Sequence, residues 1–151
     1  MRQAIDSCKG REVKGTGYTT AGGWLAIAGS VVHLCLSLMT RAGVWQDIVA
    51  AGWWSTITMK GSADQLQRAE AFWFSAGSFA VPFHILGILA VSSGRTGQRI
   101  PAPLGWTIVV WGIILGSLMP ISGAWIIMLA GILFVTGEHV QRRGSGTPES
   151  R

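Results

Sequence analysis

Three long stretches of the chain contain no charged residue: residues 15–40, 71–94 and 100–137. A helix needs about 20 apolar residues to cross the hydrocarbon core of a bilayer, so each of the first two stretches is long enough for one crossing. The third stretch would form a helix of about 57 Å, which is too long for a single crossing. The pattern therefore predicts an all-α protein in which the third stretch folds into two helices.

The sequence Pro120-Ile-Ser-Gly123 interrupts the third stretch near its middle. Pro120 has no N–H group and clashes with the preceding helical turn, so it ends a helix. Ser122 is a favoured N-cap residue, and Gly123 tolerates a tight turn. We therefore expect a tight hairpin here. The prediction is a four-helix transmembrane bundle with spans at about residues 22–40, 71–92, 102–119 and 122–139.

The segments outside these spans are more polar. We expect residues 1–20 to form a flexible basic tail and residues 141–151 a second flexible tail, on either side of a membrane domain at residues 21–140. The segment between the first two spans contains several tryptophans and isoleucines, which favours a short piece lying at the extracytoplasmic interface. Ser62 and Gln65 have capping-box spacing, which predicts a helix that begins near Ala63 and continues unbroken into the second span.

The composition supports a membrane environment. Hydrophobic residues make up 49% of the chain and charged residues 13%, whereas about 25% is typical of soluble domains. The net charge of +5 does not indicate a nucleic-acid partner, because the basic residues flank the apolar stretches and do not alternate with exposed aromatic residues. The expected partners are the lipid bilayer and, through the small-residue faces of the helices, a second copy or another membrane protein.

The distribution of basic residues predicts the orientation. With four spans, both termini lie on the same side as the loop at residues 92–103. That side carries nine basic residues and the opposite side three, so the positive-inside rule places both termini in the cytoplasm. The nine are Arg2, Lys9, Arg11, Lys14, Arg95, Arg99, Arg142, Arg143 and Arg151, and the three are Arg41, Lys60 and Arg68.

Two histidines lie within predicted spans, each on a face of small and polar residues. His33 shares its face with Ser30 and Ser37, and His84 shares its face with Gly77. Ionisable residues inside a membrane are candidates for function. Four interpretations remain open: neutral imidazoles bonded to the two serines or to backbone, a pathway for protons or small solutes, a b-type haem, and a metal site, which would need three or four ligands. Haem requires both rings to reach one iron, which a depth offset of about 7 Å makes difficult.

Arg41 and Glu70 lie at the outer ends of the same two faces, so we expect an ion pair at the outer mouth of the bundle. The sequence contains no Ser-His-acid set, HExxH motif or P-loop that would indicate catalysis. Cys8 and Cys35 are too far apart to form a metal-binding pair motif. We therefore expect a non-enzymatic membrane protein or a subunit of a membrane complex, with no metal or cofactor, and keep the pathway and the haem as alternatives.

Several short motifs along the chain resemble those of an uncharacterised family of small bacterial four-span membrane proteins, a domain of unknown function. The resemblance covers about residues 22–137. It implies a four-helix protein of the bacterial cytoplasmic membrane with a histidine at the place of His33, and it implies no activity or catalytic residue. The motifs are Gly23-Trp24-Leu25 with His33, Gly52-Trp53-Trp54, Ala71-Phe72-Trp73-Phe74, Gly105-Trp106 and Met119-Pro120-Ile121-Ser122-Gly123-Ala124-Trp125.

Overall fold

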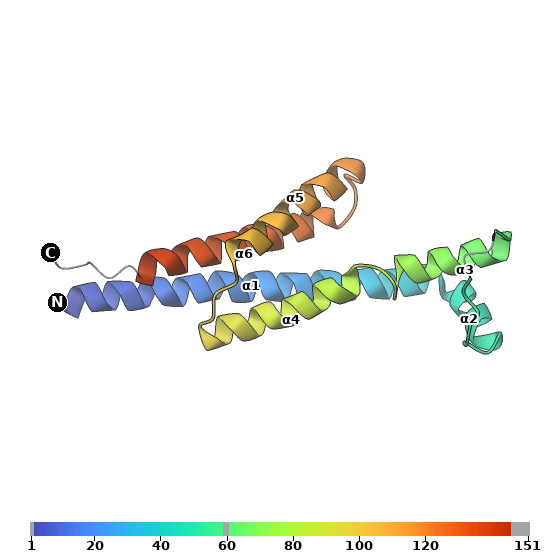
Figure 1. Cartoon of the computed structure of the whole chain (residues 1–151), viewed down its shortest axis with the longest axis horizontal. Helices are drawn as coiled ribbons and strands as arrows, with labels where there is room; N and C mark the ends of the chain where they lie inside the picture. The colour runs from blue at the N-terminus through green and yellow to red at the C-terminus, as the bar shows by residue number, and fades with distance from the viewer. Residues whose placement is uncertain (1, 59–60, 146–151) are drawn as a thin grey trace. The chain divides into compact units, whose positions relative to one another are not determined.

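A computed structural model describes residues 2–58 and 61–145. Within these residues the chain forms six α-helices and no strand, so the all-α class is confirmed (Figure 1). The described chain divides into two compact units, a first unit drawn from Met1–Gly29 and Ile85–Arg151 and a second unit, Ser30–His84. The helices are α1 (Arg2–Thr40), α2 (Ala42–Ala50), α3 (Ala63–Phe74), α4 (Ala80–Thr96), α5 (Ala102–Leu118) and α6 (Ala124–Ser145).

Both expected tails differ from the structure. Residues 2–20 were expected to be flexible, but α1 begins at Arg2. Packing against α6 explains the helix from Gly15 onward, because Thr19 is only 1% exposed and a Cβ built on Gly137 would lie 3.0 Å from the Gly15 carbonyl oxygen. At the other end α6 continues to Ser145. The remainder of the expected C-terminal tail, residues 146–151, lies outside the described residues.

Glycines bring α1 and α4 into close contact in the first unit. A Cβ built on Gly23 would lie 2.8 Å from the carbonyl oxygen of Gly87, and one built on Gly87 would lie 2.8 Å from the carbonyl oxygen of Gly23. Further along, Gly94 of α4 faces the carbonyl oxygen of Thr16. Residue numbers thus rise on α4 as they fall on α1, so the two helices are antiparallel and their backbones nearly touch.

α1 also packs against α6 in the first unit. A Cβ on Gly22 would lie 2.9 Å from the ring of Phe134, and a Cβ on Gly29 would lie 3.0 Å from Ile126. These pairs again run in opposite directions along the two helices. The N-terminal part of α1 is therefore flanked by two antiparallel neighbours, α4 and α6.

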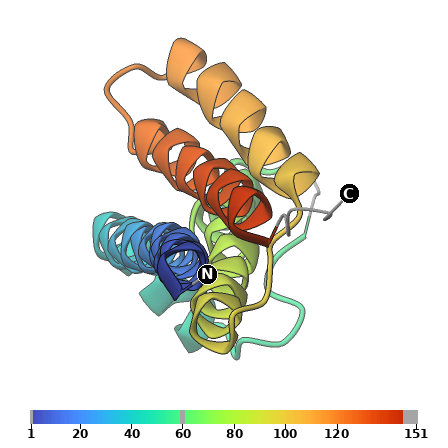
Figure 2. The same cartoon turned by 90° about the vertical axis from the view of Figure 1, so that its left-hand side faces the viewer.

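α5 and α6 form an antiparallel hairpin and lie side by side in both views (Figures 1 and 2). A Cβ on Gly105 would lie 3.0 Å from the backbone nitrogen of Val135, and a Cβ on Gly112 would lie 2.6 Å from that of Met128. Only hydrogen fits at these positions. Close packing at small residues is how helices associate in membranes, where apolar side chains gain nothing by leaving lipid.

The turn between α5 and α6 lies at Pro120. Ser122 Oγ accepts a hydrogen bond from the backbone N–H of Ala124, the first residue of α6, at 3.3 Å. The same hydroxyl donates to the carbonyl oxygen of Met119 at 2.6 Å. Trp125 Nε1 donates to the carbonyl oxygen of Pro120 at 3.0 Å and closes the turn.

The predicted unbroken helix from Ala63 into the second span is wrong. α3 begins at Ala63 as expected but ends at Phe74, and α4 begins only at Ala80. Pro82 lies in the first turn of α4, where its missing N–H is tolerated. If α4 began earlier, Pro82 would lie in the interior of the helix, where its ring clashes with a carbonyl group of the preceding turn. This explains why α4 does not extend toward α3.

The expected capping box is also wrong. Ser62 precedes α3 but makes no side-chain capping bond. Gln65 Oε1 instead accepts hydrogen bonds from Thr58, from the backbone nitrogen at 3.1 Å and from Oγ1 at 3.0 Å. Gln65 therefore holds the loop before α3, and Ser62 does not cap the start of this helix.

Two helices in the described part of the chain are long and apolar enough to cross a membrane, judged by length and composition. They are Gly15–Thr40 within α1 and Ala124–Arg143 within α6. α5 is apolar but shorter, and the predicted second span is divided between α3 and α4. Helix length therefore supports two crossings where the sequence analysis predicts four.

Candidate functional site

The side chain of His33 on α1 contacts the end of α3 in the second unit. Its Nε2 lies 3.1 Å from the backbone carbonyl oxygen of Phe74. A carbonyl oxygen can only accept a hydrogen bond, so Nε2 carries the proton and donates it. Phe74 is the last residue of α3, where carbonyl groups have no partner within the helix. His33 therefore satisfies a helix end that is distant in sequence.

Of the two serines predicted to accompany His33, Ser37 bonds to the backbone and Ser30 is buried. Ser37 Oγ donates to the carbonyl oxygen of His33 at 2.7 Å, a bond within one helical turn. Ser30 is buried. The hydroxyl of Ser37 thus bonds to the main chain of His33 and leaves the imidazole free to reach α3.

His84 differs from His33. Its Nδ1 is buried, and no hydrogen-bond partner for this atom occurs among the described residues. The described hydrogen bond of His33 goes to Phe74 and does not join the two imidazoles. The structure therefore places one histidine at a helix end and leaves the other with an unused polar atom.

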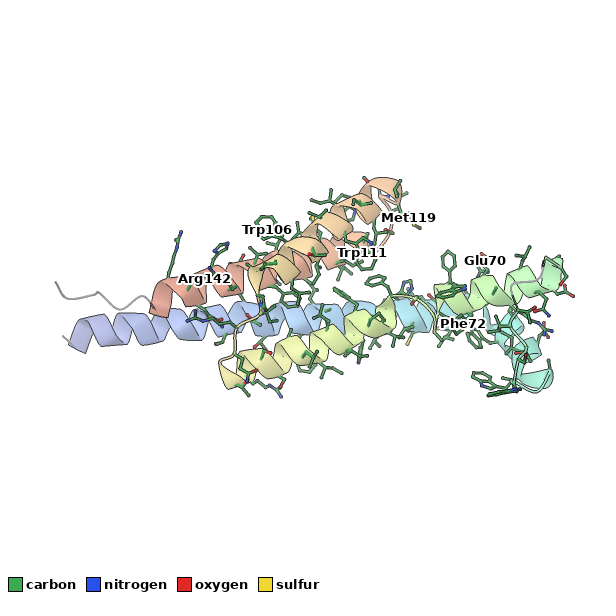
Figure 3. The ribbon with its side chains drawn as sticks, viewed as in Figure 1. Glu70, Phe72, Trp106, Trp111, Met119 and Arg142 are labelled. Atoms are coloured by element: carbon green, nitrogen blue, oxygen red, sulfur yellow. The ribbon has the colours of Figure 1, made fainter. Side chains whose placement is uncertain are left out.

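Arg41 and Glu70 form an ion pair in the second unit, with Arg41 Nη2 2.7 Å from Glu70 Oε1. Glu70 lies on α3 (Figure 3), and Arg41 directly follows α1. The hydrogen bond from Arg41, together with its positive charge, lowers the pKa of the Glu70 carboxyl below its ordinary value. The same bond raises the pKa of Arg41. The guanidinium also lies 5.4 Å from the centre of the Phe74 ring, so Arg41 contacts α3 near the carbonyl that His33 binds.

Metal-binding potential is limited in the part of the chain that the structure describes. No group of three or more His, Cys, Asp or Glu side chains there could hold a metal ion. Cys35 is a free, exposed thiol on α1. The candidate site therefore consists of His33 and the Arg41–Glu70 pair, which join α1 to α3. His84 lies on α4, and no described hydrogen bond links it to them.

Sequence reasoning did not single out Glu138 on α6, although only 3% of its side chain is exposed. Its Oε1 pairs with the Nε of Arg142, one turn later and labelled in Figure 3, and its Oε2 lies 4.0 Å from His139 Nδ1. An acid followed four residues later by a base is a signal for such a helical pair.

Residues 18–141 match the model of a family described as "Family of unknown function (DUF6463)". The match includes both histidines, the Arg41–Glu70 pair and the turn at Pro120. No curated protein and no solved structure matches the chain.

Proposed function

This chain belongs to DUF6463, a family of unknown function, and we propose that it is a multi-pass protein of the bacterial cytoplasmic membrane. It acts there as a small non-enzymatic membrane protein or as a subunit of a membrane complex. The four crossings are formed by about residues 22–40, 71–92, 102–119 and 122–139, with both termini in the cytoplasm. α2 and the loop before α3 lie at the outer interface.

The outward placement of many large apolar side chains carries this proposal. Ala26, Ala71, Ala90 and Ala130 are all 0% exposed, whereas Trp24 is 52% exposed and many large apolar side chains resemble it. Trp106 and Trp111, for example, project from α5 (Figure 3). Soluble monomers rarely expose large contiguous apolar patches to water, so this many exposed large apolar side chains would be unusual there. In a bilayer it is the expected arrangement, since lipid solvates large apolar side chains and small residues pack the helices.

The exposure of α1 supports a lipid environment over a soluble core. Core helices of soluble proteins can have the same length and apolar composition, but they are mostly buried. Only 22% of the apolar window in Gly15–Thr40 is buried within the structure. A helix of this kind needs another apolar surrounding, which the bilayer supplies.

The antiparallel contacts of the first unit support the proposed threading. α1 runs opposite to α4 and α6, and α5 runs opposite to α6. The start of α1 thus shares one end with the last turns of α4 and α6. Arg95 and Arg142 lie in those last turns, so the basic residues gather at the end that the positive-inside rule places in the cytoplasm.

Haem between the two histidines fits this geometry poorly. An imidazole that ligates iron offers it a ring nitrogen. The Nε2 of His33 is instead bonded to the Phe74 carbonyl, and that bond also fixes the end of α3. Ligation through this atom would leave the carbonyl without its donor, so we derive no role for a haem.

A polar pathway is the second candidate, favoured by one observation. The buried Nδ1 of His84 has no partner among the described residues, and unsatisfied buried polar atoms call for an explanation such as a bound water or ion. Proton flux into liposomes that is present in the wild type and lost in His84→Leu would support this candidate. Wild-type liposomes without flux would leave only the first proposal.

Cysteine accessibility tests the membrane proposal. In a Cys8→Ala, Cys35→Ala background, Gly61→Cys and Gln98→Cys place thiols in the exposed loops before α3 and after α4. A membrane-impermeant maleimide should label Gly61→Cys in intact spheroplasts and Gln98→Cys only after permeabilisation. Labelling of both without permeabilisation, or recovery of the protein in the soluble fraction, would overturn the proposal.

A further inference from the structure

A groove of about 430 Å³ runs along the contact of α1 with α4 in the first unit. On the α1 side it is lined by Trp24 and Ile27. The α4 side changes character along the helix, from Ile88 and Val91 to a last turn that supplies a hydroxyl and a cation. The α4 residues that line the groove recur every three or four positions, and they cover about 10 Å of the helix axis. The remaining lining residues are Ser92, Arg95 and Thr96.

The close contact between the two backbones creates this groove. Gly23 and Gly87 allow the helices to touch, so the larger side chains beside the contact stand up as walls. Trp24 and Ile88 remain half exposed because no other described helix covers them. The groove is therefore open along its length and suits a long, flexible apolar chain.

The polar end of the groove has a free positive charge. Arg95 forms no ion pair or hydrogen bond among the described residues. Gly97 fixes its position by ending α4 in a left-handed conformation, with a φ of 71°, and the N–H of Gln98 bonds back to the carbonyl oxygen of Ser93 at 2.8 Å. This is a Schellman ending. It holds the last turn of α4, and with it Arg95, beside the groove.

We propose that this groove binds an anionic phospholipid. One acyl chain lies against Trp24, Ile27 and Ile88, and the lipid phosphate accepts hydrogen bonds from the guanidinium of Arg95 and the hydroxyl of Ser92. This inference rests on the proposed membrane location, in which the end of α4 lies at the cytoplasmic leaflet. Negatively charged lipids attract basic residues at that surface, and guanidinium–phosphate bonds are among the strong hydrogen bonds of proteins.

A purely structural role for Arg95 makes a different prediction. A basic side chain in the last turn of a helix, such as Arg95 in α4, interacts favourably with the helix dipole. That role would change the stability of the protein when Arg95 is replaced, but it would not make the protein distinguish one headgroup from another. Lipid selectivity is therefore the property to measure.

The test is native mass spectrometry of the full chain in detergent, titrated with phosphatidylglycerol or phosphatidylcholine of the same acyl chains. The wild type should bind phosphatidylglycerol about tenfold more tightly, which corresponds to about 1.4 kcal/mol. Arg95→Gln should lose this preference. Arg143→Gln, which removes the same charge from an exposed position that does not line the groove, should keep it. Ile88→Trp, which fills the apolar part, should weaken the binding of both lipids.

Three outcomes would overturn the inference. The wild type could bind both lipids equally, Arg95→Gln and Arg143→Gln could lose selectivity to the same extent, or inorganic phosphate at millimolar concentration could displace the lipid. The last result would indicate a site for free phosphate. Any of these in a protein that passes the cysteine-accessibility test refutes the lipid site alone, whereas a soluble protein refutes both proposals.

Discussion

At the scale of single residues, His33 completes the end of a helix to which it does not belong. Its Nε2 donates to the carbonyl oxygen of Phe74, the last residue of α3. A carbonyl left without a donor costs about 1–3 kcal/mol in a protein interior, and lipid offers no replacement. This contact predicts a structural role for His33 at the end of α3.

Replacing His33 tests this role. His33→Phe should lower the free energy of unfolding in detergent by about 1–3 kcal/mol, because the Phe74 carbonyl loses its donor. His33→Gln keeps an N–H donor and should recover part of the loss. The measurement is thermal unfolding followed by circular dichroism. Equal stability of His33→Phe and the wild type would contradict the assignment.

The Arg41–Glu70 pair predicts a pH dependence. Arg41 lowers the pKa of Glu70 in the folded protein, so the pair stabilises the fold above the ordinary carboxyl pKa. That stabilisation disappears as the pH falls through the lowered folded pKa, because the carboxylate becomes protonated. Glu70→Gln should therefore unfold at a lower temperature than the wild type near neutral pH and at the same temperature in acid.

Arg41→Gln provides the matched variant, since it removes the other member of the pair. Its difference from the wild type should vanish over the same acidic range. If the wild type and both variants unfold at the same temperature at every pH, the pair contributes nothing to stability, as is common for exposed ion pairs.

The ion pair between Arg41 and Glu70 was predictable from the sequence, because each residue lies at the boundary of an apolar stretch. Sequence reasoning did not find the partner of His33. A backbone carbonyl becomes an acceptor for another helix only where its own helix ends, and the end of α3 at Phe74 was not foreseen. For the same reason Gln65 was assigned to a cap, although its side chain bonds to Thr58.

At the scale of helices, glycines set the distances between neighbours. Gly112→Ala places a methyl group 2.6 Å from the backbone nitrogen of Met128. A backbone cannot move aside as a side chain can, so the hairpin should lose about 1–3 kcal/mol of stability. Gly17→Ala is the control, because nothing lies within 4 Å of the added Cβ. It should raise stability by about 1 kcal/mol through helix propensity.

Unfolding of both variants by denaturant in mixed micelles provides the comparison. A stable Gly112→Ala variant would show that α5 and α6 are farther apart than the structure places them. Two destabilised variants would mean that glycine is needed in these helices for reasons other than packing.

Two prolines show what the sequence reveals about helix ends. Pro120 is accompanied by Ser122 and Gly123, and the reversal between α5 and α6 was predicted from that cluster. Pro82 lies in an apolar run without such neighbours, so an unbroken helix was predicted there. The helix instead ends at Phe74, and a new helix begins at Ala80, because proline is tolerated in the first turn of a helix and not farther along it.

At the scale of the whole molecule, periodicity and charge-free length identify an all-α chain with small residues on the faces where helices meet. The extent of α1 was not predictable in this way, because its first residues are polar and Gly15 and Thr19 contact α6, which is distant in sequence. A polar segment is predicted to be a flexible tail when the helix that packs against it lies far away in the sequence.

A membrane location predicts that Cys35 is protected. The thiol is exposed on α1 in the structure, so only lipid would shield it from water. In a Cys8→Ala background, a membrane-impermeant maleimide should fail to label Cys35 from either side of the membrane and should label it fully after unfolding in sodium dodecyl sulfate. Rapid labelling in intact or inverted vesicles would contradict burial in lipid.

The turn between α5 and α6 bears on how the protein is made. Residues 119–123 contain no ionisable group, and two of the turn's polar groups are already paired, through Trp125 and Ser122. Passing this turn through the bilayer dehydrates no charge. In the proposed membrane location, the last two helices are therefore suited to enter the translocon as a preassembled pair.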